Sequence, residues 1–451
     1  MASIMKKLTE STKAQKREAH CRIASAWIDS QREDMIQKLN RWVGIPSETS
    51  NLSGLDALLQ ELKKDFAVLG GQMREVSLVP QQTVDAHGNL VAHPLGKALS
   101  ILKRPKASLR IFLCVHMDTV YAANSPFQKT WDHHPHPSPL PSRERERRGA
   151  VAREEGIHPS SLSSKESKKL LNSGILQGPG VTDAKGGIVI LLKALECLER
   201  SPLAKNIGWE VLLNPDEEIG SPGSYSLLKA AAKRNHLALL FEPSHPNGSL
   251  VSFRKGSGNF TLVARGVAAH AGRDFHQGKN AILALAEWLL ELKILSQIHP
   301  EITINVGNIQ GGGAVNVVPD LAIARFNIRT PNTEIQKIVE IKLSQRPLLK
   351  KGVTFKLHGG FTSPPKPFDE KTQDLAKQFS ECAKELGFSL GFSPSGGVCD
   401  GNKLHAFGLP NLDSLGAVGG HIHSNKEFLV LDSLTQRAKL TALFLLKKAC
   451  L

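Results

Sequence analysis

Three short apolar runs in this chain end in a histidine or a carboxylate. Alternating strands and helices are typical of an α/β sheet, and a helical segment at residues 186–200 follows the first run. Ligands of such sheets bind beyond the carboxyl ends of the strands. The sequence therefore predicts an α/β domain with its chemistry along one rim. The runs are "LRIFLCVHM" at residues 109–117 before Asp118, "IGWEVLLN" at residues 207–214 before "PDEE", and "ALLF" at residues 238–241 before Glu242.

His116 and Asp118 stand two positions apart at the end of the first run. Side chains at positions i and i+2 of a strand point to the same face, so the two groups can touch. The pair has two interpretations. The groups satisfy each other at a strand terminus, or the imidazole binds a metal ion and the carboxylate fixes its tautomer and orientation.

Further histidines and carboxylates follow apolar runs or lie in glycine-rich turns. Each one alone is explained as a helix cap or a solvated loop charge. Several acids on one rim would repel each other unless cations neutralise them, and imidazole with carboxylate suits zinc. Two zinc ions carry four positive charges, which three carboxylates and a hydroxide would cancel. The groups are Asp183 in "GPGVTDAKGG", Asp216, Glu217 and Glu218 in "LLNPDEEIGSPGS", Glu242 in "FEPSHP", and His421 and His423 in "GAVGGHIHSNKEF".

Glu217 and Glu218 are adjacent acids. Adjacent side chains of an extended segment point in opposite directions, so we expect one to bind metal and the other to act as general base on a water molecule. Zinc lowers the pKa of bound water toward about 7 and polarises a carbonyl, which predicts hydrolysis of an amide.

The chain has 451 residues, more than a single core usually holds, so two domains are expected. From residue 253 strands and helices alternate in a way that indicates an α+β insert, and the first pattern resumes after residue 362. We expect a catalytic domain at 1–252 and 363–451, interrupted by an inserted domain at 253–362. Residues 131–171 are rich in Pro, Ser and charge, which predicts a disordered insertion whose removal leaves turnover unchanged.

The net charge of +15 suggests attraction to anions, but the basic residues are scattered and no nucleic-acid motif is present, so small acidic molecules are the expected partners. No apolar run approaches the length of a membrane span, and the first residues lack a signal-type core. We expect a cytoplasmic protein that binds neither membrane nor nucleic acid. Six separated cysteines form no CxxC pair, which argues against disulfides and a thiolate zinc site; they are Cys21, Cys114, Cys197, Cys382, Cys399 and Cys450.

Seven motifs occur in a recognisable order: "HMDTVY", "GPGVTDAKGG", "NPDEEIGSPGS", "FEPS", "GVAAHAG", "NVVP" and "HSNKEF". Together they resemble the di-zinc amidohydrolase and exopeptidase family that includes aminoacylase, acetylornithine deacetylase, succinyl-diaminopimelate desuccinylase and folate-cleaving glutamate carboxypeptidase. The resemblance spans residues 90–431 apart from 131–171, and it looks closest to the glutamate carboxypeptidase branch. It implies a mixed-sheet metallopeptidase domain interrupted by an α+β lid and dimerisation domain.

The resemblance also implies a role for each matching residue. One zinc ion would be held by His116, Asp183 and Glu242, and the other by Asp183, Glu218 and His423. We expect that Co²⁺ can replace Zn²⁺ at these sites. Glu217 would be the general base, and Asp118 would orient His116. His423 is preferred to His421 because it precedes "SNKE".

The inserted domain would supply further groups. His270 of "AAHAG" resembles a histidine that reaches the partner subunit's site and stabilises the oxyanion, and Arg329 of "FNIRT" resembles a residue that binds the substrate carboxylate. Asn316 and Gly397 match positions that line the substrate pocket. A buried structural histidine and a surface salt bridge remain the alternatives for His270 and Arg329.

The sequence departs from the usual family pattern at Ala184, which follows Asp183 where other branches more often have Asp or Asn. Family members usually make this peptide bond cis.

The leading hypothesis is a homodimeric two-zinc hydrolase that cleaves an amide next to a free carboxylate, in a C-terminal glutamate or an N-acyl amino acid. The alternatives are a deacetylase or desuccinylase of a biosynthetic intermediate, and a catalytically impaired relative that serves as a scaffold.

Overall fold

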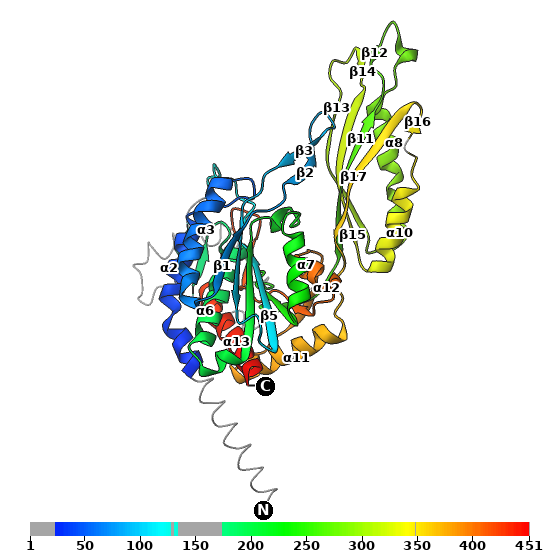
Figure 1. Cartoon of the computed structure of the whole chain (residues 1–451). Helices are drawn as coiled ribbons and strands as arrows, with labels where there is room; N and C mark the ends of the chain where they lie inside the picture. The colour runs from blue at the N-terminus through cyan, green and yellow to red at the C-terminus, as the bar shows by residue number, and fades with distance from the viewer. Residues whose placement is uncertain (1–22, 128–129, 134–173, 348, 451) are drawn as a thin grey trace, which may run out of the picture.

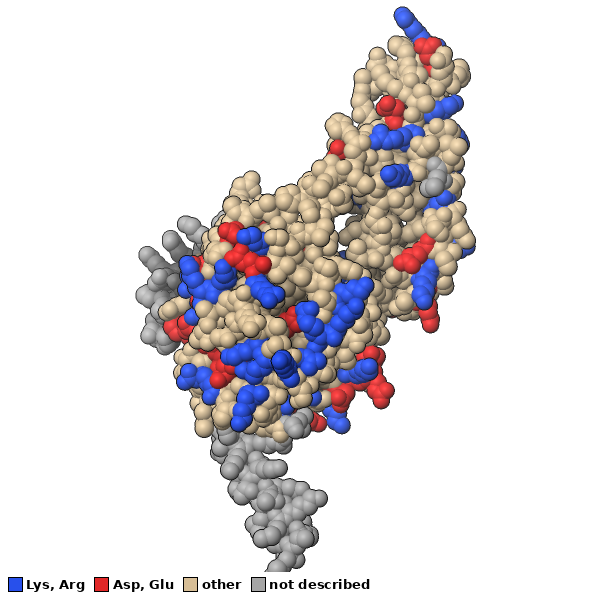
Figure 2. Space-filling model, viewed as in Figure 1, with Lys and Arg blue, Asp and Glu red and all other residues tan. Residues whose placement is uncertain are grey.

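The computed structural model describes residues 23–127, 130–133, 174–347 and 349–450 (Figure 1). These residues form two parts, each built around its own sheet. Lys and Arg are interspersed with Asp and Glu on the face shown in Figure 2. Among the helices of the described ranges, none has both the length and the apolar character that crossing a membrane requires.

The first part is built on a six-stranded mixed sheet. The three strands β8, β5 and β9 run parallel, so their carboxyl ends lie along one rim. Strand β19 adds a parallel edge, β4 runs antiparallel to β8, and β1 runs antiparallel to β4. This confirms the predicted α/β fold with a mixed sheet. The strands in spatial order are β1 (Gln72–Val76), β4 (Ala98–Lys103), β8 (Ile207–Asn214), β5 (Leu109–His116), β9 (Leu237–Leu240) and β19 (Asn411–Leu412).

Helices cover both faces of this sheet (Figure 1). Alternate residues of β5 point to opposite faces: Ile111 and Leu113 join one buried cluster, while Phe112 and Cys114 join another. Helix α6 is buried along almost its whole length because most of its side chains are apolar. The first cluster includes residues of α2 (Arg32–Val43), α3 (Leu52–Phe66), α6 (Gly186–Glu199), α11 (Glu370–Glu385) and α13 (Leu431–Ala449), and the second those of α7 (Tyr225–Arg234) and α12 (Asp400–Ala406).

The second part is an antiparallel five-stranded sheet formed by residues 256–363, with two long helices packed on it. Its core includes Leu262, Trp288, Phe326 and Val339. The chain enters and leaves this part from the first, as expected of an inserted α+β domain; the boundaries at 253 and 362 stay a prediction. The strands in spatial order are β13 (Thr303–Gly311), β15 (Leu321–Thr330), β11 (Gly256–Arg265), β17 (Val353–Ser363) and β16 (Leu349–Lys350), and the helices are α8 (Ala281–Glu291), α9 (Lys293–Ser296) and α10 (Thr333–Ser344).

A hairpin of strands β2 (Gln81–Val84) and β3 (Leu90–His93) connects the two parts. Val84 packs with Val263 and Ile323 of the second sheet. Arg325 donates from its guanidinium to the Val84 carbonyl over 2.7 Å. The hairpin therefore holds the second sheet above the first (Figure 1).

A small four-stranded sheet corrects one expectation. Residues 131–133, predicted to begin the disordered insertion, form strand β6 (Trp131–His133) because β7 (Ile175–Gln177), from beyond the insertion, offers an edge for antiparallel pairing. Residues 134–171 of that insertion lie outside the described residues. The sheet is completed by β21 (Phe428–Val430) and β20 (Gly419–Gly420); the remaining strands are β10 (Leu250–Arg254) with β18 (Phe392–Ser395), and β12 (Ala269–His270) with β14 (Val317–Val318).

Short helical turns complete the described elements. They are η1 (Ala67–Leu69), η3 (Val181–Lys185), η4 (Pro202–Asn206), η5 (Glu217–Ile219) and η6 (Phe275–Gln277). Two of them, η3 and η5, carry predicted site residues and lie where the chain turns from a strand toward a helix.

Candidate metal centre

The carboxyl ends of β5, β8 and β9 bring the first predicted groups to one rim. His116 is the last residue of β5 and is buried, Glu217 and Glu218 follow β8, and Glu242 follows β9. His116 Nε2 lies 3.7 Å from Glu242 Oε2. Parallel pairing of these strands therefore places an imidazole and acids from distant parts of the sequence side by side.

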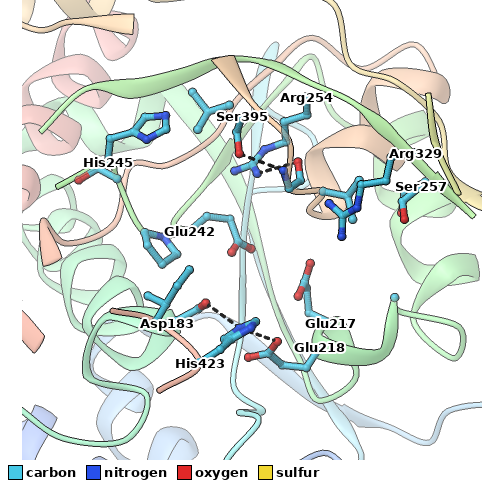
Figure 3. Close-up of a pocket in the computed structure, with 18 of the residues that line it drawn as sticks. Asp183, Glu217, Glu218, Glu242, His245, Arg254, Ser257, Arg329, Ser395 and His423 are labelled. Carbon is cyan, nitrogen blue, oxygen red and sulfur yellow. Dashed lines mark hydrogen bonds and ion pairs between the residues drawn. The ribbon is translucent and has the colours of Figure 1, made fainter. Parts of the chain in front are cut away.

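Asp183 lies between the two predicted histidine ligands. Its Oδ1 is 3.0 Å from His116 Nε2, and its Oδ2 is 3.3 Å from His423 Nε2. His423 Nε2 also lies 3.2 Å from Glu218 Oε2. Figure 3 shows Asp183, Glu218 and His423 converging on one space, with Glu242 above them. One carboxylate thus faces an imidazole with each oxygen, as a ligand shared by two ions must.

The backbone around Asp183 is irregular, which allows its side chain to leave the line of the following helix. The peptide bond between Asp183 and Ala184 is cis, as the resemblance implied. Gly180, just before, has φ +70°, and a Cβ there would approach Thr119 within 2.6 Å, so glycine is needed at this turn. Helix α6 begins directly after the turn, at Gly186.

Asp118 holds the other side of the His116 ring. His116 Nδ1 lies 3.0 Å from the Asp118 carbonyl oxygen and 3.4 Å from its Oδ1. The Asp118 carboxylate in turn accepts hydrogen bonds from Thr49 Oγ1 and from the backbone N–H groups of Glu217 and Glu218, at 2.7, 3.2 and 3.2 Å. With Nδ1 engaged, Nε2 is left facing Asp183 and Glu242.

Burial and mutual repulsion perturb the acids of this rim. Burial, opposed by His116 and reinforced by Asp183, raises the pKa of Glu242 to about 8. Burial and then Glu242 raise the pKa of Glu217 well above its usual value. Hydrogen bonds to Asp183 and Glu218 raise the pKa of His423 to about 10. The cluster thus carries more negative charge than its buried surroundings favour, which is the condition that a divalent cation relieves.

The donors fit a metal ion. Facing ligand atoms of His116, Asp183 and Glu218 lie within 4.8 Å of one another. Glu218 Oε1 is buried and has no hydrogen-bond partner in the described part of the chain. A buried carboxylate oxygen without a donor is costly unless a cation contacts it. Imidazole and carboxylate together are ligands that zinc accepts.

The two adjacent glutamates correct another expectation. They do not lie in an extended segment but in the short turn η5, because Asp118 and Asp216 accept hydrogen bonds from this turn's backbone and the residues after it. The side chains nevertheless diverge: Glu218 points to His423, and Glu217 points to the side where Arg329 lies (Figure 3).

A cavity of about 450 Å³ opens above these groups. Arg329 and Gly397 line its opposite wall. Arg329 donates from Nε to Asn327 Oδ1 over 3.2 Å and from Nη1 to the Gly396 carbonyl. His421 also lines the cavity, but its ring packs near Phe428 and makes no ion pair with the acids, whereas His423 does.

His270 and Asn316 lie elsewhere. Both are exposed, and they meet where the Ala271 N–H donates to the Asn316 carbonyl over 2.9 Å. His270 ends β12 and Asn316 directly precedes β14, and these two strands lie at the end of the second part farthest from the first (Figure 1). Neither residue is among those lining the cavity of its own chain, so the expectation that Asn316 lines a substrate pocket stays a prediction.

The structure adds charged residues that the sequence did not single out. Arg254 lines the cavity and is buried; its guanidinium binds the Asp413 carboxylate at 3.1 and 2.9 Å. Lys403 also lines the cavity and donates to Asp400 Oδ1 over 3.0 Å. Their segments, "SFRKGSG" and "CDGNKLHAFG", show charged residues next to glycine, which was the only signal for them.

Comparison with known proteins gives a family model and many relatives. The model described as peptidase family M20/M25/M40 matches residues 159–447. Carboxypeptidase G2 from Pseudomonas sp. is 27% identical over 272 residues, which are 59% of this chain and 65% of that protein. A probable carboxypeptidase from Aspergillus clavatus is 38% identical over 171 residues, 35% of this chain and 40% of that protein. The matches thus span less than two thirds of these two relatives.

Succinyl-diaminopimelate desuccinylase from Hahella chejuensis is 28% identical over 286 residues, 59% of this chain and 72% of that protein. Two solved structures share the fold. Aminopeptidase PepT from Bacillus cereus has a TM-score of 0.61 and 19% identity, covering 92% of this chain and 98% of its own. The M20 family metallo-carboxypeptidase Sso-CP2 from Sulfolobus solfataricus has a TM-score of 0.60 and 17% identity, covering 92% and 99%.

Proposed function

This chain belongs to peptidase family M20/M25/M40, and from that premise we propose that it is a two-zinc hydrolase that cleaves an amide bond next to a free carboxylate. The position of Asp183 between His116 and His423 carries the proposal. In this proposal one zinc ion binds His116, Asp183 and Glu242. The other binds Asp183, Glu218 and His423.

The proposed mechanism assigns proton transfer to Glu217. When bound, the zinc ions act as Lewis acids toward the amide carbonyl and lower the pKa of water. Glu217 takes a proton from the attacking water and delivers it to the leaving amine. Asp118 keeps His116 oriented through Nδ1.

The opposite wall of the cavity supports a substrate that carries a free carboxylate. The Arg329 guanidinium is a planar fork that suits bidentate carboxylate binding. Asn259, Asn327 and Gly397 stand in the same wall and offer neutral polar groups. A C-terminal glutamate or an N-acyl amino acid fits this wall. The name of one relative, carboxypeptidase G2, supports cleavage at a C-terminal residue, and that of another, succinyl-diaminopimelate desuccinylase, supports a desuccinylase as the second candidate.

We include a homodimer in the proposal because His270 lies away from the cavity of its own chain. The N–H groups of Gly272 and Arg273 both donate to His270 Nδ1 over 3.1 Å, so the exposed Nε2 carries the proton of the neutral ring. A second copy placed against the second sheet would bring this donor, with Asn316, to the cavity of its partner. There it would stabilise the oxyanion.

Glu217→Gln tests the function. Purified protein loaded with zinc, and in parallel with Co²⁺, is screened against N-acyl amino acids and glutamyl conjugates. We expect the substitution to lower kcat by at least about 10²-fold, since a general acid–base contributes that much, while two zinc ions stay bound. Glu334→Gln on exposed α10 is the matched control and keeps full turnover. An unchanged kcat in Glu217→Gln, or an inactive wild type that binds zinc, would favour the scaffold hypothesis.

A further inference from the structure

Glu427 is a buried carboxylate outside the proposed ligand set. It lies four residues after His423, and its side chain has no exposure to solvent. Oε1 accepts hydrogen bonds from the N–H groups of Thr182 and Asp183 at 2.8 and 2.9 Å. Oε2 accepts one from the N–H of Gly180 at 3.0 Å and lies 2.6 Å from the Tyr121 hydroxyl. Four donors therefore surround its two oxygens, which is the full capacity of a carboxylate.

These contacts connect three loops, each of which carries a proposed zinc ligand. Tyr121 stands five residues after His116, residues 180–183 end in Asp183, and Glu427 follows His423. Other bonds reinforce the connection: the Tyr121 hydroxyl lies 2.9 Å from the Ser424 carbonyl oxygen, and Thr182 Oγ1 donates to the Phe428 carbonyl over 2.6 Å. One side chain thus determines how the three loops lie relative to one another.

The irregular backbone at Asp183 explains why a carboxylate is needed there. Residues 180–183 are outside the regular ladder of α6, so their N–H groups cannot donate to helix carbonyls one turn earlier. Buried N–H groups without an acceptor are costly. Glu427 supplies acceptors for three of them at once, including the N–H of Asp183 itself. A glutamine would keep one oxygen and turn an NH₂ group toward donors.

We propose that Glu427 is a positioning residue that holds Asp183 between the two ion sites, so that the affinity for both zinc ions depends on a side chain that ligates neither. The inference rests on the proposed function, because it takes Asp183 as the shared ligand. A shared ligand that loses its orientation weakens both sites together, whereas a change at an unshared ligand weakens one. Partners that orient metal ligands typically contribute about 10–100-fold to metal affinity.

The test measures zinc affinity in Glu427→Gln. Holoenzyme is titrated with a chromophoric chelator at fixed pH, and the affinity of each of the two sites is obtained. We expect both sites to weaken together by about 10-fold or more. Tyr121→Phe removes one of the four donors and should weaken both sites by a smaller factor. The absorption spectrum of the Co²⁺-loaded variants should change as well, since the orientation of the shared ligand changes.

Glu199→Gln is the matched control, because Glu199 is a carboxylate held by Arg104, Lys103 and Trp209 away from the rim. It should lower the unfolding midpoint and leave zinc affinity unchanged. Wild-type affinity in Glu427→Gln, or weakening of one ion alone, overturns the inference; if that variant does not fold, unchanged affinities in Tyr121→Phe overturn it. A wild type that fails to bind two zinc ions refutes the proposed function instead.

Discussion

Arg329 is the cation that most directly faces a bound substrate in the proposed function. Its substitution by alanine removes charge-assisted hydrogen bonds of about 1.5–3 kcal/mol each, so kcat/KM for a carboxylate substrate should fall by about 10- to 100-fold or more. Arg329→Lys should retain part of the binding, because a lysine keeps the charge without the planar fork. Steady-state kinetics on a substrate and on its carboxamide analogue measure the effect.

Arg325 provides the control for Arg329. Arg325 lies four residues before Arg329 on the same strand, β15. Its guanidinium donates to the Val84 carbonyl of the hairpin and does not line the cavity. Arg325→Ala should leave kcat/KM near that of the wild type. If Arg329→Ala lost no discrimination between the carboxylate and the carboxamide, the proposed substrate contact would be excluded.

The individual site residues divide into those that sequence could indicate and those that it could not. His116, Asp183, Glu218 and Glu242 were expected together because each follows an apolar run or lies in a glycine-rich turn, and the structure brings them to one rim. Arg254, Lys403 and Glu427 were missed. Arg254 and Glu427 have partners 159 and 245 residues away, and pairings between distant segments depend on packing that no local pattern encodes. Lys403 has its partner Asp400 only three residues away, but its place in the cavity wall depends on how α12 packs in the fold.

At the scale of an element, Glu199 at the end of α6 should make the stability of the fold depend on pH. Burial alone would raise the pKa of Glu199, but hydrogen bonds from Arg104, Lys103 and Trp209 lower that pKa from 4.5 to about 2. A carboxyl whose pKa is depressed in the folded state stabilises it above pH 4.5, and this contribution is lost as the pH falls from 4.5 toward 2. The group is partly exposed, so we expect about 1 kcal/mol rather than the full value of the shift.

Glu199→Gln should therefore reduce the free energy of unfolding at pH 7 by about 1 kcal/mol, and the difference from wild type should shrink by pH 3. Urea unfolding at both pH values measures it. Glu385→Gln is the control, since Glu385 contacts Lys447 at an exposed position, and it should have little effect at either pH. A difference that grew on acidification would contradict the sign of this prediction.

Sequence periodicity located most elements of the first part. The apolar runs became β5, β8 and β9, and the apolar segment at 186–200 became α6. Strand β6 was missed because residues 131–133 have no strand-like alternation and pair only through the edge that β7 presents. The hairpin contact with the second sheet was missed for a related reason: Val84 becomes buried only when Val263 and Ile323 are placed beside it.

At the scale of the whole molecule, the second part leaves apolar surface uncovered. Leu283, Leu290 and Ile294 are 61%, 65% and 59% exposed on α8 and α9, and the neighbouring strand β13 is an edge of its sheet. Exposed apolar groups beside an open strand edge are typical of an interface. We expect Leu283→Lys with Leu290→Lys to convert a dimer into monomers in sedimentation velocity, while Ile341→Lys on α10, which is 54% exposed, leaves the dimer intact. A wild type that sediments as a monomer would contradict the proposed assembly.

The resemblance implied that His270 acts in the site of a partner subunit, which stays a prediction. His270 is exposed and lies far from the cavity of its own chain, so a variant that lacks it should be complemented in trans by a second chain. His270→Ala and Glu217→Gln should each be nearly inactive alone, whereas His276→Ala, an exposed neighbour on the same projection, should stay active. When the two inactive variants are mixed and allowed to exchange subunits, the mixed dimer joins an intact Glu217 of one chain to an intact His270 of the other.

Random exchange should restore about a quarter of wild-type activity, since about half of the dimers are mixed and each mixed dimer has one complete site out of two. Activity that stays at the level of the separate variants, although subunit exchange is verified by differently tagged chains, would place His270 outside the reaction.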